Sequence, residues 1–202
     1  MPADTALHAT ADTRLAGPAA VAAAPAPLKC HWARTHAIVN LRGNPQDAAF
    51  TAAVGAALGL PLPQRASECP ATATRRIVWA GPDDWFVIGE PGEEAALASA
   101  LRAAAAGTHH AVTDVSSGYA VLTLAGASAH DVLAQGCPLD LHLRAFPVGT
   151  SAGTHFFKAS VWMWRTGAER FELLVRTSFA GYVEALLKAC TRECGMVDSP
   201  QD

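Results

Sequence analysis

The stretch HAIVNLRGNPQDAAFTAAVGAALG, residues 36–59, decides the fold because its hydrophobic period changes once along its length. It begins with an apolar run, 37–41, that is typical of a β-strand. Asn44 and Pro45 then predict a helix start, since Asn caps free backbone amides and Pro suits the first helical position. Apolar residues follow at every fourth position, and Gly59 predicts the end of the helix. The stretch is therefore predicted to fold as strand, tight turn and helix.

Two further apolar runs follow that helix, 77–80 and 85–88, and a GPDD turn separates them. Runs of this length on either side of a turn predict a β-hairpin. A second helix is predicted over 93–106, and Gly107 is typical of a helix stop. The first half of the chain thus reads βαββα.

The second half repeats this order of elements at a constant displacement of about 83 to 87 residues. The matching stretches are NLRGNP with TLAGAS, VWAGPDDWFVIGE with MWRTGAERFELLV, and EEAALASALRAA with FAGYVEALLKAC. A displacement shared by several elements indicates an internal repeat. We therefore expect an α+β fold of two similar βαββα lobes related by a pseudo-twofold axis, with antiparallel or mixed sheets and helices on one face of each.

This interpretation divides the chain into four parts. A disordered Ala/Pro-rich tail is expected at 1–27, where Pro residues and an early Asp argue against a signal peptide. The first α+β lobe is expected at 28–107 and the second at 108–195. Residues 196–202 are expected to form a flexible C-terminus.

Composition limits the classes of function. Lys and Arg total 15 against 18 Asp and Glu, for a formal charge of -3, and no basic window with interleaved aromatic residues occurs. Nucleic acid is therefore not an expected partner. Pro, Gly and charged residues interrupt every apolar stretch, so no membrane association is expected. The five cysteines are scattered without C-x-x-C spacing, which favours a reduced, cytoplasmic location.

The clearest element is a final helix after Ser178, which is predicted as its cap. Its buried face is predicted to contain four apolar residues spaced at three and four positions. These are Phe179, Val183, Leu186 and Cys190. Glu184 and Lys188 are predicted to form an i,i+4 ion pair on another face.

The stretch LAQGCPLDLHLRAF, 133–146, offers a thiol, a carboxylate, an imidazole and a guanidinium within eight residues: Cys137, Asp140, His142 and Arg144. A zinc site would need ligands that converge on one point, and a nucleophilic site would need an orienting third group. Instead, residues 139–144 alternate between Leu and polar side chains, which predicts a half-buried strand. We therefore expect no metal site and no catalytic residue here.

The remaining titratable candidates are histidines. His130 and His155 could complete a metal site only if tertiary packing brought them to Cys137 and His142. His109 and His110 follow Gly107 in the link between the lobes, where solvent exposure is expected.

Aromatic residues gather in the second hairpin and beside it. Trp162 and Trp164 are two positions apart, so they share one face of a strand. Phe156 and Phe157 are close enough in the sequence to extend that apolar patch. If no element of the same chain covers it, the patch is a candidate partner interface.

Four of these stretches carry a resemblance to a known family. NLRGNPQDAAF, VWAGPDDWFVIGEPG, TDVSSGYAVLTLAG and above all VLAQGCPLDLHLRAFPVGT resemble the gamma subunit of heterotetrameric sarcosine oxidase. The resemblance runs from about Leu28 to Cys190. It implies a fold similar to the folate-binding aminomethyltransferase (glycine-cleavage T protein) type, in agreement with paired α+β lobes.

The resemblance also implies a function. Enzymes of this family are bacterial cytoplasmic αβγδ complexes that oxidatively demethylate sarcosine to glycine. By resemblance, this chain would be an accessory gamma subunit that assembles with alpha, beta and delta subunits. The FAD, FMN, NAD and tetrahydrofolate sites would belong to those other subunits, so no cofactor and no catalytic residue is expected in this chain.

Two other functions remain as alternatives. A freestanding folate-binding protein of the T-protein class, acting in one-carbon metabolism, should hold the pterin with a carboxylate and an Arg. Asp114, Arg144 and Glu172 are the candidates for that role. A standalone metal hydrolase would need ligands that the sequence does not show.

Overall fold

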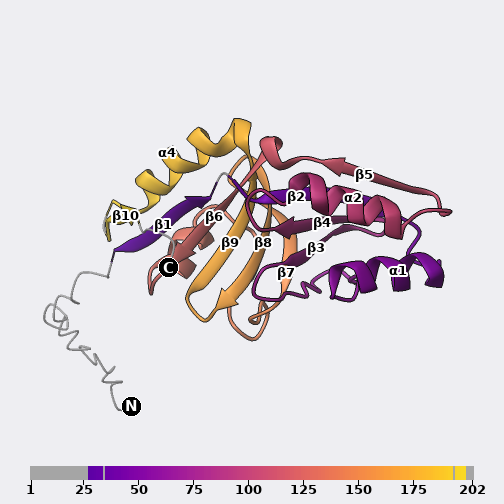
Figure 1. The fold of residues 1–202 in the computed structure, drawn as a ribbon. Helices are drawn as coiled ribbons and strands as arrows, with labels where there is room; N and C mark the ends of the chain where they lie inside the picture. Colours follow the sequence, from indigo (N-terminus) through magenta and orange to yellow (C-terminus); the bar gives the residue numbers. More distant parts are fainter. Residues whose placement is uncertain (1–26, 34, 193, 199–202) are drawn as a thin grey trace, which may run out of the picture.

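The computed structural model of the chain describes residues 27–33, 35–192 and 194–198. Within them, two β-sheets pack against each other, and helices cover the outer face of each sheet (Figure 1). The tail expected at 1–27 lies outside the described residues except for Pro27. The expected α+β class is confirmed.

The larger sheet has six strands in the order β10-β1-β6-β9-β8-β7, and the smaller has four in the order β3-β4-β2-β5. The strands of the six-stranded sheet are β1 Leu28–Ala33, β6 Tyr119–Ala125, β7 Ser151–Phe156, β8 Ala159–Gly167, β9 Arg170–Arg176 and β10 Met196–Asp198. Those of the four-stranded sheet are β2 Ala37–Gly43, β3 Arg76–Gly81, β4 Asp84–Gly89 and β5 His110–Asp114. All pairings are antiparallel except β1 with β10.

Each sheet has its own pair of helices. Helices α1 (Ala48–Leu58) and α2 (Glu94–Ala104) pack on the four-stranded sheet, on the right in Figure 1. Helices α3 (Ala129–Ala134) and α4 (Ala180–Cys190) pack on the six-stranded sheet, with α4 in yellow. The remaining helical turns are the 3-10 segments η1 (Ser116–Gly118) and η2 (Thr177–Phe179). The predicted order, strand, helix, hairpin and helix, occurs in the first half, whereas in the second half an additional strand, β7, precedes the hairpin of β8 and β9.

Three strands that the sequence analysis did not predict connect parts of the chain that we expected to be separate. β1 belongs to the first half of the chain, yet it pairs with β6 in the six-stranded sheet. β5 begins the second half, yet it pairs with β2 in the four-stranded sheet. β10 occupies residues expected to be a flexible terminus, because its backbone pairs in parallel with β1. The sheets therefore do not follow the predicted division at residue 107.

Helix α1 begins later than predicted. Asp47, not Asn44, is its N-cap, because the Asp47 carboxylate accepts hydrogen bonds from the amides of Ala49 (2.9 Å) and Phe50 (3.2 Å). The Asn44 side chain instead accepts the N–H of Gln46 in the preceding turn. Gly59 ends the helix in the left-handed conformation, with φ 67°, as predicted.

A core of side chains joins the two sheets. It includes Val78, Phe86 and Ile88 from the four-stranded sheet and Val121, Trp164 and Leu174 from the six-stranded sheet. Phe86 and Trp162 meet edge to face, with ring centroids 4.8 Å apart. Because each sheet packs on helices with one face and on the other sheet with the opposite face, its central strands are buried on both sides.

This core changes the interpretation of the aromatic patch. Trp162 and Trp164 do share a face, but the four-stranded sheet covers it, and Trp164 is only 1 % exposed. Phe156, also 1 % exposed, packs in the core between the six-stranded sheet and its helices. Phe157 is half-buried at the edge of that core. Trp164 and Phe156 are therefore core residues of this chain.

The buried face of α4 is rotated from the predicted one. Ala180, Val183 and Leu187 are its buried residues, and Leu186 and Cys190 lie at the flank. Phe179 is the N-cap and is 38 % exposed, because η2 leads directly into the helix and takes the place of a Ser178 side-chain cap. The Glu184–Lys188 ion pair is confirmed at 2.6 Å.

The two adjacent leucines of α4 give a test of this packing. Leu187→Ala is expected to lower the free energy of unfolding by about 2 to 5 kcal/mol, because it leaves a cavity under the helix. Leu186→Ala, at the flank, is expected to cost about 1 kcal/mol. Chemical denaturation of both variants measures the difference. Equal losses would contradict the assigned face.

Candidate functional site

The polar residues of 137–146 do not form a strand and do not converge. The segment is a loop of turns that connects α3 to β7. Asp140 accepts the backbone N–H of His142 (3.0 Å), and the His142 carbonyl accepts the N–H groups of Ala145 and Phe146. The predicted strand over 139–144 is wrong because these local hydrogen bonds curl the backbone away from the neighbouring sheet.

The loop is anchored by two buried apolar side chains, Leu141 and Phe146. Between them, His142, Leu143 and Arg144 point to solvent, and Leu143 is 45 % exposed. The ring Nδ1 of His142 accepts only the nearby Arg144 N–H (3.3 Å). In this segment, the alternation of Leu with polar residues therefore corresponds to a turn whose two ends are buried.

The buried guanidinium of Arg165, on β8, holds this loop. Its side chain is 3 % exposed and contacts no carboxylate in the described structure. Nη1 donates to the carbonyls of Leu141 (2.9 Å) and Phe146 (2.8 Å), while Nε and Nη2 donate to Gly167 and Ala168 in the hairpin turn. The guanidinium also lies over the Phe171 ring, 4.6 Å from its centroid. Burial lowers the pKa of Arg165 from its ordinary value, but an Arg stays protonated in proteins.

A second polar cluster lies between the sheets near Glu172 of β9. Glu172 accepts the indole N–H of Trp164 (2.6 Å) and lies 3.7 Å from the Arg170 guanidinium. A hollow of about 170 Å³ opens beside it, lined in part by His36, Arg75 and Arg76. Two of its cations have contacts within the chain, because Arg75 Nη2 pairs with Glu93 and the Arg76 guanidinium lies 5.4 Å from the Trp164 ring centroid, whereas Arg75 Nε is buried without a hydrogen-bond partner.

Cys69, which lies beside Arg76, is not an activated nucleophile. Burial raises the pKa of its thiol, and the nearby Arg76 charge only partly offsets that effect. A raised pKa keeps the group as a thiol near neutral pH.

The three folate candidates are not brought together. Asp114 lies on the edge strand β5, Arg144 in the exposed loop and Glu172 beside the inter-sheet hollow, and no contact joins any two of them in the described structure. The Ser116 hydroxyl and backbone N–H both donate to Asp114, and these hydrogen bonds lower its pKa. The hollow beside Glu172 is also smaller than the roughly 300 Å³ or more of typical ligand pockets. These residues do not fit a pterin.

The histidine candidates are separated as well. His109 and His110 line a surface hollow with Arg42 and Asp83, which form their own ion pair. His130 contacts its neighbour Asp131, whereas His155 lines a hollow next to Cys137. Among the residues that the structure describes, no three His, Cys, Asp or Glu side chains are grouped to hold a metal ion. No described helix is long and apolar enough to cross a membrane.

Sequence reasoning missed Arg165, although a signal for it exists. In β8, Val161 and Met163 face the helices, and Trp162 and Trp164 face the other sheet. Alternation therefore places Arg165 on the helix-covered face. A charged residue on a face predicted to be buried indicates a partner that the local sequence does not reveal.

Arg165→Met tests this anchor, because Met preserves much of the side-chain volume and removes every donor. Four carbonyls then lose a hydrogen bond, and we expect a loss of about 3 to 5 kcal/mol in the free energy of unfolding. Trypsin should also cut faster after Arg144, since the loop loses its anchor. Arg170→Met, a surface change in the same hairpin, should cost under about 0.5 kcal/mol. Unchanged proteolysis of the Arg165 variant would refute the anchoring role.

Comparison with known families gives a match over most of the chain. The family model described as "Sarcosine oxidase, gamma subunit family" matches residues 42–193. A sarcosine oxidase subunit gamma from Arthrobacter sp. is 38 % identical over 155 residues, which are 76 % of this chain and 75 % of the relative. A subunit of the same name from Corynebacterium sp. (strain P-1) is 38 % identical over 70 % of this chain and 68 % of its own length.

Solved structures give a consistent result. A chain of the heterotetrameric sarcosine oxidase from Corynebacterium sp. U-96, in complex with pyrrole 2-carboxylate, matches with a TM-score of 0.79 and 28 % identity. The match covers 88 % of this chain and 92 % of that chain. Aminomethyltransferase T of the glycine cleavage system from Bartonella henselae matches with a TM-score of 0.59 and 18 % identity, over 81 % of this chain and 46 % of that one. The second match shows a shared fold alone.

Proposed function

Because this chain belongs to the sarcosine oxidase gamma subunit family, we propose that it is an accessory subunit of a heterotetrameric complex that oxidatively demethylates sarcosine to glycine. The observation that carries the proposal is the structural match, which spans 92 % of a chain from such a heterotetramer. In this role the chain contributes to assembly and has no catalytic centre of its own.

The internal chemistry of the chain supports an assembly role. Its buried cation, Arg165, donates to backbone carbonyls and so stabilises a loop. Glu172, a carboxylate that lines the inter-sheet hollow, accepts the Trp164 N–H. Groups that are engaged in such contacts stabilise the fold. A catalytic site would instead need titratable groups that converge on a substrate.

The wider setting of the complex is also a proposal. We propose that the partners are alpha, beta and delta subunits, that FAD, FMN, NAD and tetrahydrofolate bind to them, and that the complex works in the cytoplasm of a bacterium in one-carbon metabolism. The family membership of this chain supports each of these points.

The similar order of the two sheets supports a second, evolutionary proposal. The orders β3-β4-β2 and β8-β9-β6 correspond. Both hairpins also shift register near their turns, at Trp79/Gly81 and at Arg165/Gly167. We propose that the halves arose by duplication and are related by a pseudo-twofold axis, with β1 and β5 exchanged between their sheets.

The alternative of a freestanding folate-binding protein receives less support. The relatives at 38 % identity are gamma subunits, and the T-protein match is limited to the fold. The folate candidates also lie on separate elements.

Gentle purification of the tagged chain from its native cell tests the main proposal. We expect a large assembly with flavin absorbance and sarcosine-dependent oxygen uptake. A colourless species at the 21.0 kDa of the chain alone would contradict it.

His142→Ala separates an assembly role from a catalytic one. The His142 side chain is exposed and bonds only within its own turn, so turnover of the assembled complex should stay within about threefold of the parent. Sarcosine-dependent oxygen uptake, measured on complex of verified subunit content, gives the answer. A loss of about a hundredfold with assembly intact would place a functional group in this loop.

A further inference from the structure

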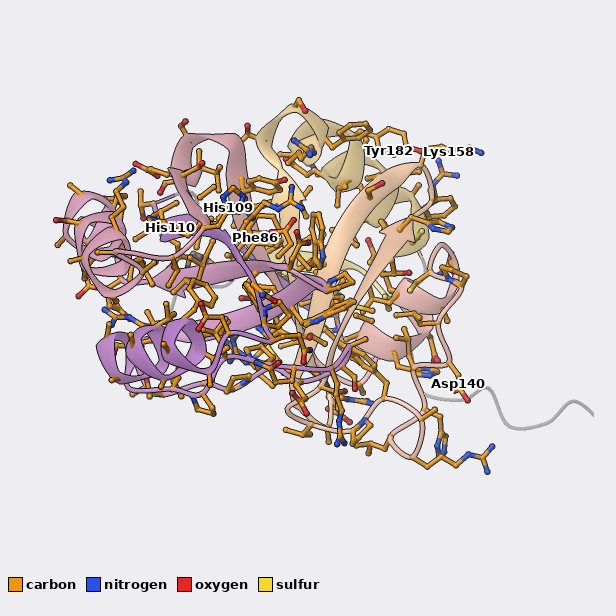
Figure 2. The ribbon with its side chains drawn as sticks, turned by 90° about the vertical axis from the view of Figure 1, so that its right-hand side faces the viewer. Phe86, His109, His110, Asp140, Lys158 and Tyr182 are labelled. Atoms are coloured by element: carbon orange, nitrogen blue, oxygen red, sulfur yellow. The ribbon has the colours of Figure 1, made fainter. Side chains whose placement is uncertain are left out.

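A surface hollow of about 450 Å³ lies where three parts of the second half meet. The segment after α3 contributes Gly136 and Cys137, the turn between β7 and β8 contributes Phe157 and Lys158, and α4 contributes Tyr182. Figure 2 shows Lys158 and Tyr182 close together at the edge of the molecule. No residue assigned above to the inter-sheet core lines this hollow.

The backbone beside the hollow adopts a conformation that its side chain disfavours. Phe157 has φ 52°, in the left-handed region, at a two-residue turn where Gly or Asn is usual. Its N–H donates to the Gly136 carbonyl at 2.8 Å. A Cβ on residue 136 would lie 2.3 Å from the Phe157 ring, so Gly136 is what allows the ring to lie there. Strain of this kind persists only where the surrounding structure holds it, and here the Gly136 contacts hold Phe157 beside the hollow.

Aromatic surface continues from the hollow along α4. Tyr182 and Phe179 are each 38 % exposed and meet edge to face with centroids 6.1 Å apart. They are two of the five large hydrophobic residues that are exposed within the described ranges. Exposed aromatic side chains with a neighbouring cavity are typical of the central contacts of protein interfaces.

The rim of the hollow carries a cation and no carboxylate. Lys158 is exposed and lines the hollow beside His155, whereas no Asp or Glu does. Neither residue forms an ion pair with a carboxylate in the described part of the chain. This local excess contrasts with the overall charge of -3 and favours an acidic occupant.

We propose that this hollow receives a short segment of another subunit of the complex, one that carries an apolar or aromatic side chain next to an Asp or Glu. The apolar side chain packs between Phe157 and Tyr182, and the neighbouring carboxylate pairs with Lys158. The inference rests on the proposed function, since it names the contact through which the accessory subunit is held.

The test uses the complete complex, assembled with the tagged chain as wild type or as the double variant Lys158→Glu, Tyr182→Ser. Both residues are exposed, so the variant chain should keep the wild-type melting temperature. We expect the double variant to hold the other subunits about tenfold or more weakly, as for loss of a central interface contact. It should also release them at a lower NaCl concentration. Arg65→Glu, an exposed cation remote from the hollow, is the matched control and should behave as wild type.

Photocrosslinking identifies the occupant. Benzoylphenylalanine at position 182 should crosslink to another subunit, and the same group at position 65 should not. The inference is overturned if the double variant assembles and resists salt as wild type does, or if position 182 crosslinks only to a second copy of this chain. Failure of the wild-type chain to purify with any other subunit would instead refute the proposed function.

Discussion

The exchange of β1 and β5 between the two sheets is the constraint on which the architecture depends. Each half of the chain supplies its first strand to the sheet of the other half, so neither sheet is complete until both halves have formed. The inner faces of the two sheets pack against each other over Phe86, Trp162 and Trp164. Every central strand is then buried on both faces, which explains apolar runs such as those of β2 and β4 where a solvated sheet would alternate.

The sequence predicts elements that local chemistry determines. The period change in 36–59 locates β2 and α1, and Gly59 ends the helix as expected. The sequence does not predict the exchange of β1 and β5, because the hydrophobic period of a strand does not depend on which distant strand it pairs with. The error at 139–144 has a local cause. Alternating Leu residues fit a strand and a turn equally well, and only the Asp140 and His142 hydrogen bonds and the Arg165 anchor distinguish the two.

The same reasoning explains how much of the candidate site could be predicted. The strand predicted over 139–144 would have placed Asp140, His142 and Arg144 on one face, whereas the structure places them in a loop of turns. The burial of Arg165 could have been predicted from the sequence, since alternation in β8 puts this residue on the helix-covered face. Its partners are backbone carbonyls, however. Every residue has a backbone carbonyl, so the sequence does not indicate which of them accept hydrogen bonds from Arg165. A buried cation satisfied in this way is therefore found only in the folded chain.

Burial on both faces of each sheet also limits where a partner can bind. The inner faces are joined to each other and the outer faces are covered by helices, so the sheets offer only their edges and connecting segments. The hollow beside Tyr182 lies at such a place, between a loop, a hairpin turn and the exposed side of α4. The same loop is fixed from beneath by Arg165, which reduces the conformational entropy that ordering it on binding would cost. Among the described residues Arg165 is the buried cation, and its hydrogen bonds to the carbonyls of Leu141 and Phe146 provide that rigidity.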